Sequence, residues 1–203
     1  MLKNVNQYQL SKEENTQYIM KLGYAKFMTG DSQGAIEALE EAYKTTEGSD
    51  KNDIAYMLGH LYYADGQNEK AFTFFDQIKE NEKYARVVKP YYVQLYFNDK
   101  DYDKAILEGN ALLNENISAN YKAEVHKMIG ESYFMKGDYS SAYPHLKIYL
   151  ESKGTPSESD LYEMGFVSAH LKKYDEAVSY YNQLINSNSA TSQNAYYQLG
   201  NAY

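Results

Sequence analysis

The chain of 203 residues contains no cysteine, no tryptophan and only three prolines. Without cysteine it can form no disulfide scaffold, no cysteine-ligated zinc site and no thiol catalytic centre. Glycine is also sparse, at 12 residues, which excludes collagen-like and proline-rich low-complexity classes. The apolar runs all fall short of the roughly 18 residues that a membrane-spanning helix needs. We therefore expect no direct membrane insertion.

Positive charge is scarce as well. The 28 acidic residues outnumber the 20 Lys and Arg residues, which gives a net charge of −8. A protein that binds nucleic acid usually offers excess positive charge to the phosphates, so we expect no nucleic-acid partner. What the chain does contain is 43% hydrophobic residues, among them 24 tyrosines. This is enough apolar material for a folded core.

Neither end of the chain carries a clear signal. The residues after Met1 lack the apolar segment and the small-residue cleavage site of a secretory signal peptide. The chain stops at Tyr203 inside an apolar-periodic stretch, without a helix stop signal. We therefore expect a fragment of a longer protein, with residues 1–14 as a lead-in segment. The compartment stays open: the periplasm or cell envelope if an export signal was removed, and the cytoplasm otherwise.

A repeat of about 35 residues runs through the chain. Small residues that follow a large apolar residue recur at this spacing: Gly23, Gly59, Gly130, Gly165 and Gly200, with Val93 in the remaining place. An alanine stands twelve residues after each of the first five places: Ala35, Ala71, Ala105, Ala142 and Ala177. Turn signals separate the two markers: Gly30-Asp31, Gly66-Gln67, Lys100-Asp101, Gly137-Asp138 and Lys172-Lys173.

Each unit is predicted to form a helix, a tight turn and a second helix. The residues on either side of the turn have a helical period and no strand alternation. Glycine adopts the left-handed conformation that ends a helix, and aspartate caps the start of the next one. Small residues such as Gly130 and Ala142 allow the two helices to cross closely. We expect about eleven helices and no sheet.

This pattern resembles the tetratricopeptide repeat, whose helix–turn–helix units of 34 residues share the spacing of small residues seen here. The resemblance covers residues 15–203, as five full repeats and the first helix of a sixth. It implies an all-α fold, a right-handed α-solenoid of stacked hairpins. The tyrosine- and asparagine-rich repeats look like those of multi-repeat Bacteroidetes-type proteins, which usually carry an export signal.

The sequence departs from the family pattern in several places. The tryptophan and the closing proline of the pattern are missing throughout. In the third repeat Val93 replaces the glycine, and Gly109 replaces the aromatic residue of the second helix. Pro90 and Pro144 fall inside predicted helices, so each should kink its helix or delay its start. A loop that includes Pro156 is expected to precede a helix starting near Ser159.

No catalytic, metal or cofactor signature is found. The four histidines His60, His126, His145 and His170 form no zinc-binding pattern within a helix. The sequence has no nucleophile elbow, phosphate-binding loop or dinucleotide-binding fingerprint. The many carboxylates, such as Glu37 and Glu41, fit a solvated helix face. We therefore predict that the chain is not an enzyme and binds no cofactor.

The first helices of a tetratricopeptide solenoid line its concave surface. By helical geometry this predicted groove is formed by mostly aromatic and uncharged residues: Met20, Tyr24, Phe27, Tyr56, His60, Tyr63, Gln94, Phe97, Lys127, Glu131, Phe134, Tyr162, Phe166, His170, Tyr197 and Asn201. Two interpretations stay open. These rings could simply pack against neighbouring repeats, or they could bind a peptide, because Tyr and Phe supply rigid contact area.

The family resemblance implies a scaffold or adaptor that binds a protein or peptide partner in this groove. Some relatives grip a C-terminal carboxylate with Lys and Asn, but here Met20 and Tyr24 stand at those places. An extended or helical apolar peptide fits better. One alternative is the regulatory or substrate-recruiting part of a larger enzyme or sensor. Another is self-association through exposed terminal repeats, where Tyr196 and Leu199 would lack a covering helix.

Overall fold

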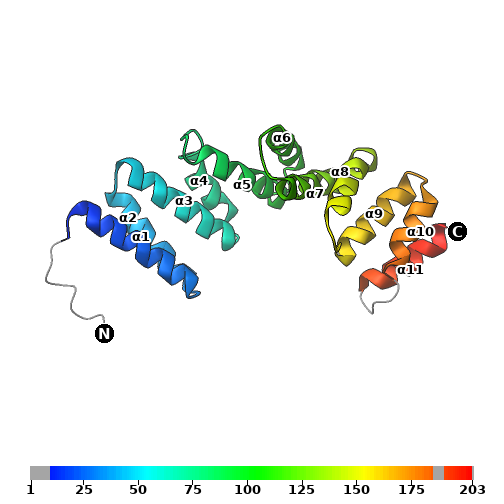
Figure 1. The fold of residues 1–203 in the computed structure, drawn as a ribbon. Helices are drawn as coiled ribbons and strands as arrows, with labels where there is room; N and C mark the ends of the chain where they lie inside the picture. Colours follow the sequence, from blue (N-terminus) through cyan, green and yellow to red (C-terminus); the bar gives the residue numbers. More distant parts are fainter. Residues whose placement is uncertain (1–9, 185–189, 203) are drawn as a thin grey trace. The chain divides into compact units, whose positions relative to one another are not determined.

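The computed structural model describes residues 10–184 and 190–202, and in these ranges it contains eleven α-helices and no strand (Figure 1). The predicted all-α fold is therefore confirmed, as is the expected number of helices. The chain divides into two compact units, Met1–Lys89 and Pro90–Tyr203, which are described separately below. The expected division into a lead-in and a repeat region stays a prediction.

The first unit contains two helix pairs. Its helices are α1 (Lys12–Met28), α2 (Ser32–Thr45), α3 (Gly48–Ala64) and α4 (Asn68–Asp76). The helices α1 and α2 pack on each other, as do α3 and α4, and α2 also packs against α3. Ser11 caps α1 through a capping box with Glu14, which satisfies two amides at the start of the helix.

The second unit continues the same pattern. Its helices are α5 (Ala85–Asn98, which begins before the boundary), α6 (Tyr102–Leu113), α7 (Ala119–Met135), α8 (Tyr139–Ser152), α9 (Glu158–His170), α10 (Tyr174–Asn182) and α11 (Ala190–Ala202). The helices α7 and α8 form one pair, and α9 and α10 form the next. The last helix, α11, packs on α9 and α10.

Left-handed residues join the two helices of every pair, at the positions that the repeat spacing predicted. Their φ angles are all positive: Gly30 (84°), Gly66 (74°), Lys100 (62°), Gly137 (75°) and Lys172 (60°). In three pairs an aspartate follows at once and its side chain accepts a hydrogen bond from a backbone amide of the second helix. The repeat alignment therefore identified the turns even where lysine replaces glycine.

Lys172 holds a conformation that an L-residue adopts at a cost of about 1–2 kcal/mol. Glycine avoids that cost but loses more backbone entropy on folding, so we expect Lys172→Gly to stabilise the chain by roughly 0.5–1 kcal/mol. Urea unfolding followed by circular dichroism measures the change. Lys172→Ala removes the side chain without relieving φ and should bring no gain. Gly137→Ala places an L-residue in the left-handed conformation and should lower the stability of the chain by about 1 kcal/mol. A gain from Lys172→Ala equal to that from Lys172→Gly would contradict this reasoning.

The two helices of each pair approach closely where the small residues were predicted to lie. All five repeat alanines are fully buried. The glycine of the first helix contacts the residue four positions after that alanine. A methyl group on Gly59 would lie 2.5 Å from the Phe75 ring, and one on Gly165 would lie 2.6 Å from Tyr181. Glycine is therefore required for this packing.

The third repeat reverses this arrangement. Val93 is fully buried on α5, and a Cβ on Gly109 of α6 would lie 3.6 Å from it. The large side chain thus comes from the first helix, and the space for it from the second. The same Cβ would lie 2.7 Å from Ile129 of α7, so Gly109 also lets the next repeat pack closely. The two departures from the family pattern compensate for each other.

The two prolines inside helices do not delay the helix starts. Pro90 lies within α5 and Pro144 within α8, each five residues after the first helical residue. A proline at this depth leaves only one carbonyl without its usual amide partner, that of Arg86 or Ser140. Both residues are exposed, so water can satisfy their carbonyls. Neither proline lies in the first turn of its helix, so neither marks the helix start, and the other expectation, a kink, stays a prediction.

Candidate partner-binding surfaces

A cavity of about 250 Å³ opens between α1 and α3 in the first unit. It is lined by Gly23, Tyr24 and Phe27 of α1 and by Tyr56, Met57, His60 and Leu61 of α3. Gly23 also lies where α1 crosses α2, because a Cβ there would come within 2.8 Å of the Leu39 side chain. None of the lining side chains is a carboxylate, lysine or arginine, so the cavity suits an apolar group.

Ring contacts fix the walls of this cavity. Phe27 meets His60 edge-on, with ring centroids 5.8 Å apart. Tyr56 stacks on the buried ring of Tyr84 at 5.4 Å. Burial lowers the pKa of His60, so its imidazole is neutral near pH 7. Tyr24 is 58% exposed at the mouth of the cavity and is free to contact a ligand.

Four of the predicted groove residues thus surround one cavity: Tyr24, Phe27, Tyr56 and His60. Met20 and Tyr63 belong to the same helices but do not line it. The sequence prediction missed Met57 and Leu61, which lie one turn or less from His60. A cavity between two helices is lined by residues next to the predicted face of each helix as well as by residues on that face.

A second aromatic surface lies on the second unit, where α7, α8 and α9 meet. Phe166 contacts Phe134 edge-on at 5.6 Å, Tyr162 at 6.3 Å and His170 at 4.1 Å between ring centroids. All four were predicted groove residues. Tyr139, the first residue of α8, completes the cluster at 5.5 Å from Phe166. It was missed because the predicted groove included residues of the first helices only, and Tyr139 belongs to a second helix.

Three further predicted residues, Phe97, Gln94 and Tyr197, take part in neither surface. Phe97 meets Tyr102 across the turn between α5 and α6 at 5.7 Å. Gln94 donates a hydrogen bond to Asn98 on the same helix. Tyr197 is 70% exposed on α11. The side chains of Asn201, Tyr196 and Leu199 lie outside the described residues.

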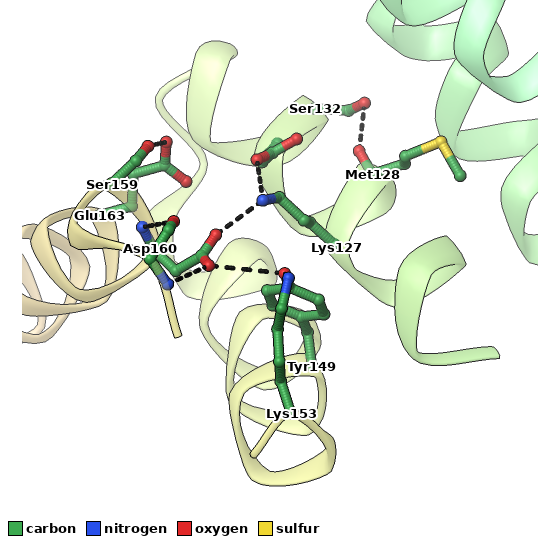
Figure 2. Close-up of polar contacts among 10 residues, drawn as sticks. Lys127, Met128, Ser132, Tyr149, Lys153, Ser159, Asp160 and Glu163 are labelled. Atoms are coloured by element: carbon green, nitrogen blue, oxygen red, sulfur yellow. Dashed lines mark hydrogen bonds and ion pairs between the residues drawn. The ribbon is translucent and has the colours of Figure 1, made fainter. Parts of the chain in front are cut away.

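Lys127 and Glu131, the two charged residues of the predicted groove, belong to a polar network between α7 and α9. Figure 2 shows Lys127 pointing toward Asp160. The Lys127 Nζ lies 2.7 Å from Asp160 Oδ1 and 3.5 Å from Glu131 Oε1. The Asp160 side chain is only 3% exposed. It also accepts the backbone amide of Ser157 at 2.8 Å and the hydroxyl of Tyr149 at 3.4 Å.

Two further carboxylates hold their protons unusually tightly in this network. Burial is the main cause that raises the pKa of Glu163 to about 7, and the charge of the nearby Glu131 is the second cause. Burial likewise raises the pKa of Glu131, although Lys127 opposes the shift. For Asp160, burial alone would raise the pKa, but hydrogen bonds from Lys127 and Ser157 outweigh it and the net direction is down. Lys127 thus forms ion pairs with two of these carboxyl groups, Asp160 and Glu131.

The sequence prediction overlooked Asp160 and Glu163. It placed the start of α9 near Ser159, whereas the helix begins at Glu158 with Ser157 as its N-cap. Ser157 and Asp160 form a capping box, which is a recognisable sequence signal. The same signal fixes the Asp160 carboxylate where Lys127 can reach it. Lys127 and Glu131 therefore belong to a network with buried carboxyl groups that the predicted groove residues did not include.

Within the ranges 10–184 and 190–202, no group of three or more acidic or histidine side chains lies close enough together to hold a metal ion. In the same ranges, none of the helices is both long and apolar enough to cross a membrane.

Comparison with known proteins identifies the repeats. Residues 20–85 and 161–190 each match a tetratricopeptide repeat model. A TPR repeat-containing protein of Methanocaldococcus jannaschii, MJ1428, is 27% identical over 176 residues, and the match covers 83% of this chain. The chain spans about 30% of the length of that relative.

Solved structures share the fold at lower identity. A tetratricopeptide repeat protein from Parabacteroides merdae has a TM-score of 0.72 at 19% identity, over 92% of this chain and 74% of its own. MamA from Desulfovibrio magneticus RS-1 has a TM-score of 0.71 at 13% identity, over 87% of this chain and 96% of its own. Helix pairs, turn conformations and these matches agree: the chain is a tetratricopeptide repeat protein.

Proposed function

We propose that this chain is a non-catalytic scaffold that binds a protein partner by taking an apolar side chain of the partner into the cavity between α1 and α3. The fold supports a protein-interaction scaffold in general. The observation that carries the finer proposal is the cavity itself, which four predicted groove residues line. Its walls are held by ring contacts, so little ordering is needed on binding.

The chemistry of the cavity defines the ligand. A volume of about 250 Å³ with aromatic, Met and Leu walls suits a large apolar side chain such as Leu, Met or Phe. The neutral His60 supplies one polar contact for orientation. Because no formal charge lines the cavity, affinity should change little with ionic strength.

Peptides selected from a random phage-displayed library on the whole chain test this proposal. We expect the selected peptides to share a large apolar residue and Tyr24→Ala to weaken their binding at least about tenfold. Tyr24 is mostly exposed, so the variant should fold normally. Tyr18→Ala is a matched control, since Tyr18 is 48% exposed on the same helix but lies outside the cavity. Isothermal titration calorimetry measures the affinities.

Two results would reject the cavity as the binding site. One is equal affinity of the selected peptides for the wild-type chain and Tyr24→Ala. The other is binding that disappears between about 0.05 and 0.5 M salt, which would indicate a charged surface instead. The alternative role, as the recruiting part of a larger enzyme or sensor, uses the same cavity and is compatible with the short span of MJ1428 that this chain covers.

A further inference from the structure

Two histidines that lie 19 residues apart in the sequence meet between the helices of the fourth repeat. His126 lies on α7 and His145 on α8, and their Nδ1 atoms are 3.0 Å apart. The ring centroids are 5.0 Å apart, so the two rings point their Nδ1 atoms toward each other. Both side chains are half-buried and keep contact with solvent. Neither residue lines the surfaces described above.

We propose that His126 and His145 form a chelating site for a divalent transition-metal ion of the Cu²⁺ or Ni²⁺ type. With metal–nitrogen bonds of about 2.0–2.1 Å, two nitrogens 3.0 Å apart subtend an angle of roughly 94° at the metal. Neighbouring ligands in the tetragonal geometry of these ions are about 90° apart. A tetrahedral Zn²⁺ site would require the nitrogens to separate further.

The protonation state of the two imidazoles also suits a metal ligand. Burial is the main cause that lowers the pKa of both histidines, and the Lys122 charge adds to the effect at His126. Neutral imidazole is the form that binds metal. In the metal-free pair one Nδ1–H donates to the other Nδ1. On metal binding that proton moves to Nε2 of the same ring, so no net proton is released.

The site is open, because the fold provides two ligands and water fills the other positions. The described residues contain no third histidine or carboxylate in reach of both. Since the ligands come from both helices of one hairpin, a bound ion would cross-link α7 to α8. It would bind the folded chain better than the unfolded one and therefore raise the melting temperature.

Titration of the whole chain with CuCl₂ tests the proposal. We expect one saturable site per chain, with an electron paramagnetic resonance spectrum showing two coordinated nitrogens and a melting temperature that rises with metal. His126→Gln and His145→Gln should each weaken binding at least about tenfold, since even loss of an outer-shell partner costs that much. His60→Gln and His170→Gln are matched controls, which should bind Cu²⁺ as the wild-type chain does.

A second measurement needs no variant and so does not depend on how the substituted chains fold. Cu²⁺ should broaden the imidazole resonances of His126 and His145 in the wild-type chain before those of His60 and His170. The proposal is overturned if the wild-type chain shows no saturable Cu²⁺ site. It is also overturned if the first resonances to broaden belong to the other two histidines, or if both Gln variants at the site keep the wild-type affinity.

Discussion

Replacing Gly130 with leucine is expected to destabilise the chain by about 3 kcal/mol or more. Even an alanine methyl group there would lie 2.8 Å from the Leu146 side chain and 3.0 Å from the backbone nitrogen of Leu146. A side chain can rotate away, but a backbone atom moves only with its helix. The substitution therefore has to push α8 away from α7. Because repeat stability is shared through neighbouring interfaces, the adjacent repeats should lose stability too.

Gly200→Ala provides the matched control for this prediction. Gly200 also lies inside a helix, α11, but nothing would meet its Cβ within 4 Å. Alanine is the better helix former by about 1 kcal/mol, so Gly200→Ala should stabilise where Gly130→Ala destabilises. Urea unfolding followed by circular dichroism compares the variants. Equal midpoints for Gly130→Leu and the wild-type chain would show that the predicted crossing is in the wrong register.

The helices and turns of this molecule could be predicted because the same repeat occurs five times along the chain. Lys100 and Lys172 would not be predicted as left-handed residues on their own, since lysine rarely adopts that conformation. Their alignment with Gly30 and Gly137 placed them at the turn, and their φ angles agree. The exchange of Val93 and Gly109 was visible only as two separate defects. Recognising that they compensate requires knowing that they face each other.

The candidate surfaces were only partly predictable, for a different reason. Helical period places a residue on a face, and this was enough to bring Tyr24, Phe27 and His60 to one cavity. It does not say what approaches from the next helix. Asp160 reaches Lys127 because a capping box holds it at the start of α9. His126 meets His145 through the pairing of α7 with α8, which no spacing within one helix reveals.

Substituting Lys127 with methionine should give the other large effect, and this effect should depend on pH. Lys127 is the cation closest to the buried Asp160, at 2.7 Å, and also pairs with Glu131. Methionine keeps the length of the side chain but removes the positive charge beside Asp160, Glu131 and Glu163. Breaking a buried ion pair costs about 3–5 kcal/mol. We expect about 2–4 kcal/mol at pH 8, because Lys127 and Glu131 retain some solvent contact.

The loss should be smaller at pH 5. A carboxyl group whose pKa is raised on folding adds stability that is complete below its unfolded pKa and is lost as the pH rises through its folded pKa. Glu163 has a folded pKa of about 7 against an ordinary value of 4.5, and the pKa of Glu131 is also raised. At pH 5 Glu163 is largely protonated in the folded chain, so removing the cation leaves less uncompensated charge. At pH 8 Glu163 is mostly ionised, and its charge is opposed by that of the nearby Glu131.

Lys153→Met separates this effect from the loss of any lysine nearby. The Lys153 ammonium lies 4.9 Å from the centre of the Tyr149 ring, and that of Lys127 lies 5.0 Å from it. Lys153 is exposed and hydrogen-bonds to the Tyr149 hydroxyl, so its removal should cost much less stability than that of Lys127 at either pH. Urea midpoints of both variants at pH 5 and pH 8 measure the difference. If Lys127→Met lost the same stability at both pH values, the raised carboxyl pKa values would not be the cause. If it lost no more than Lys153→Met, the network would not hold α7 to α9.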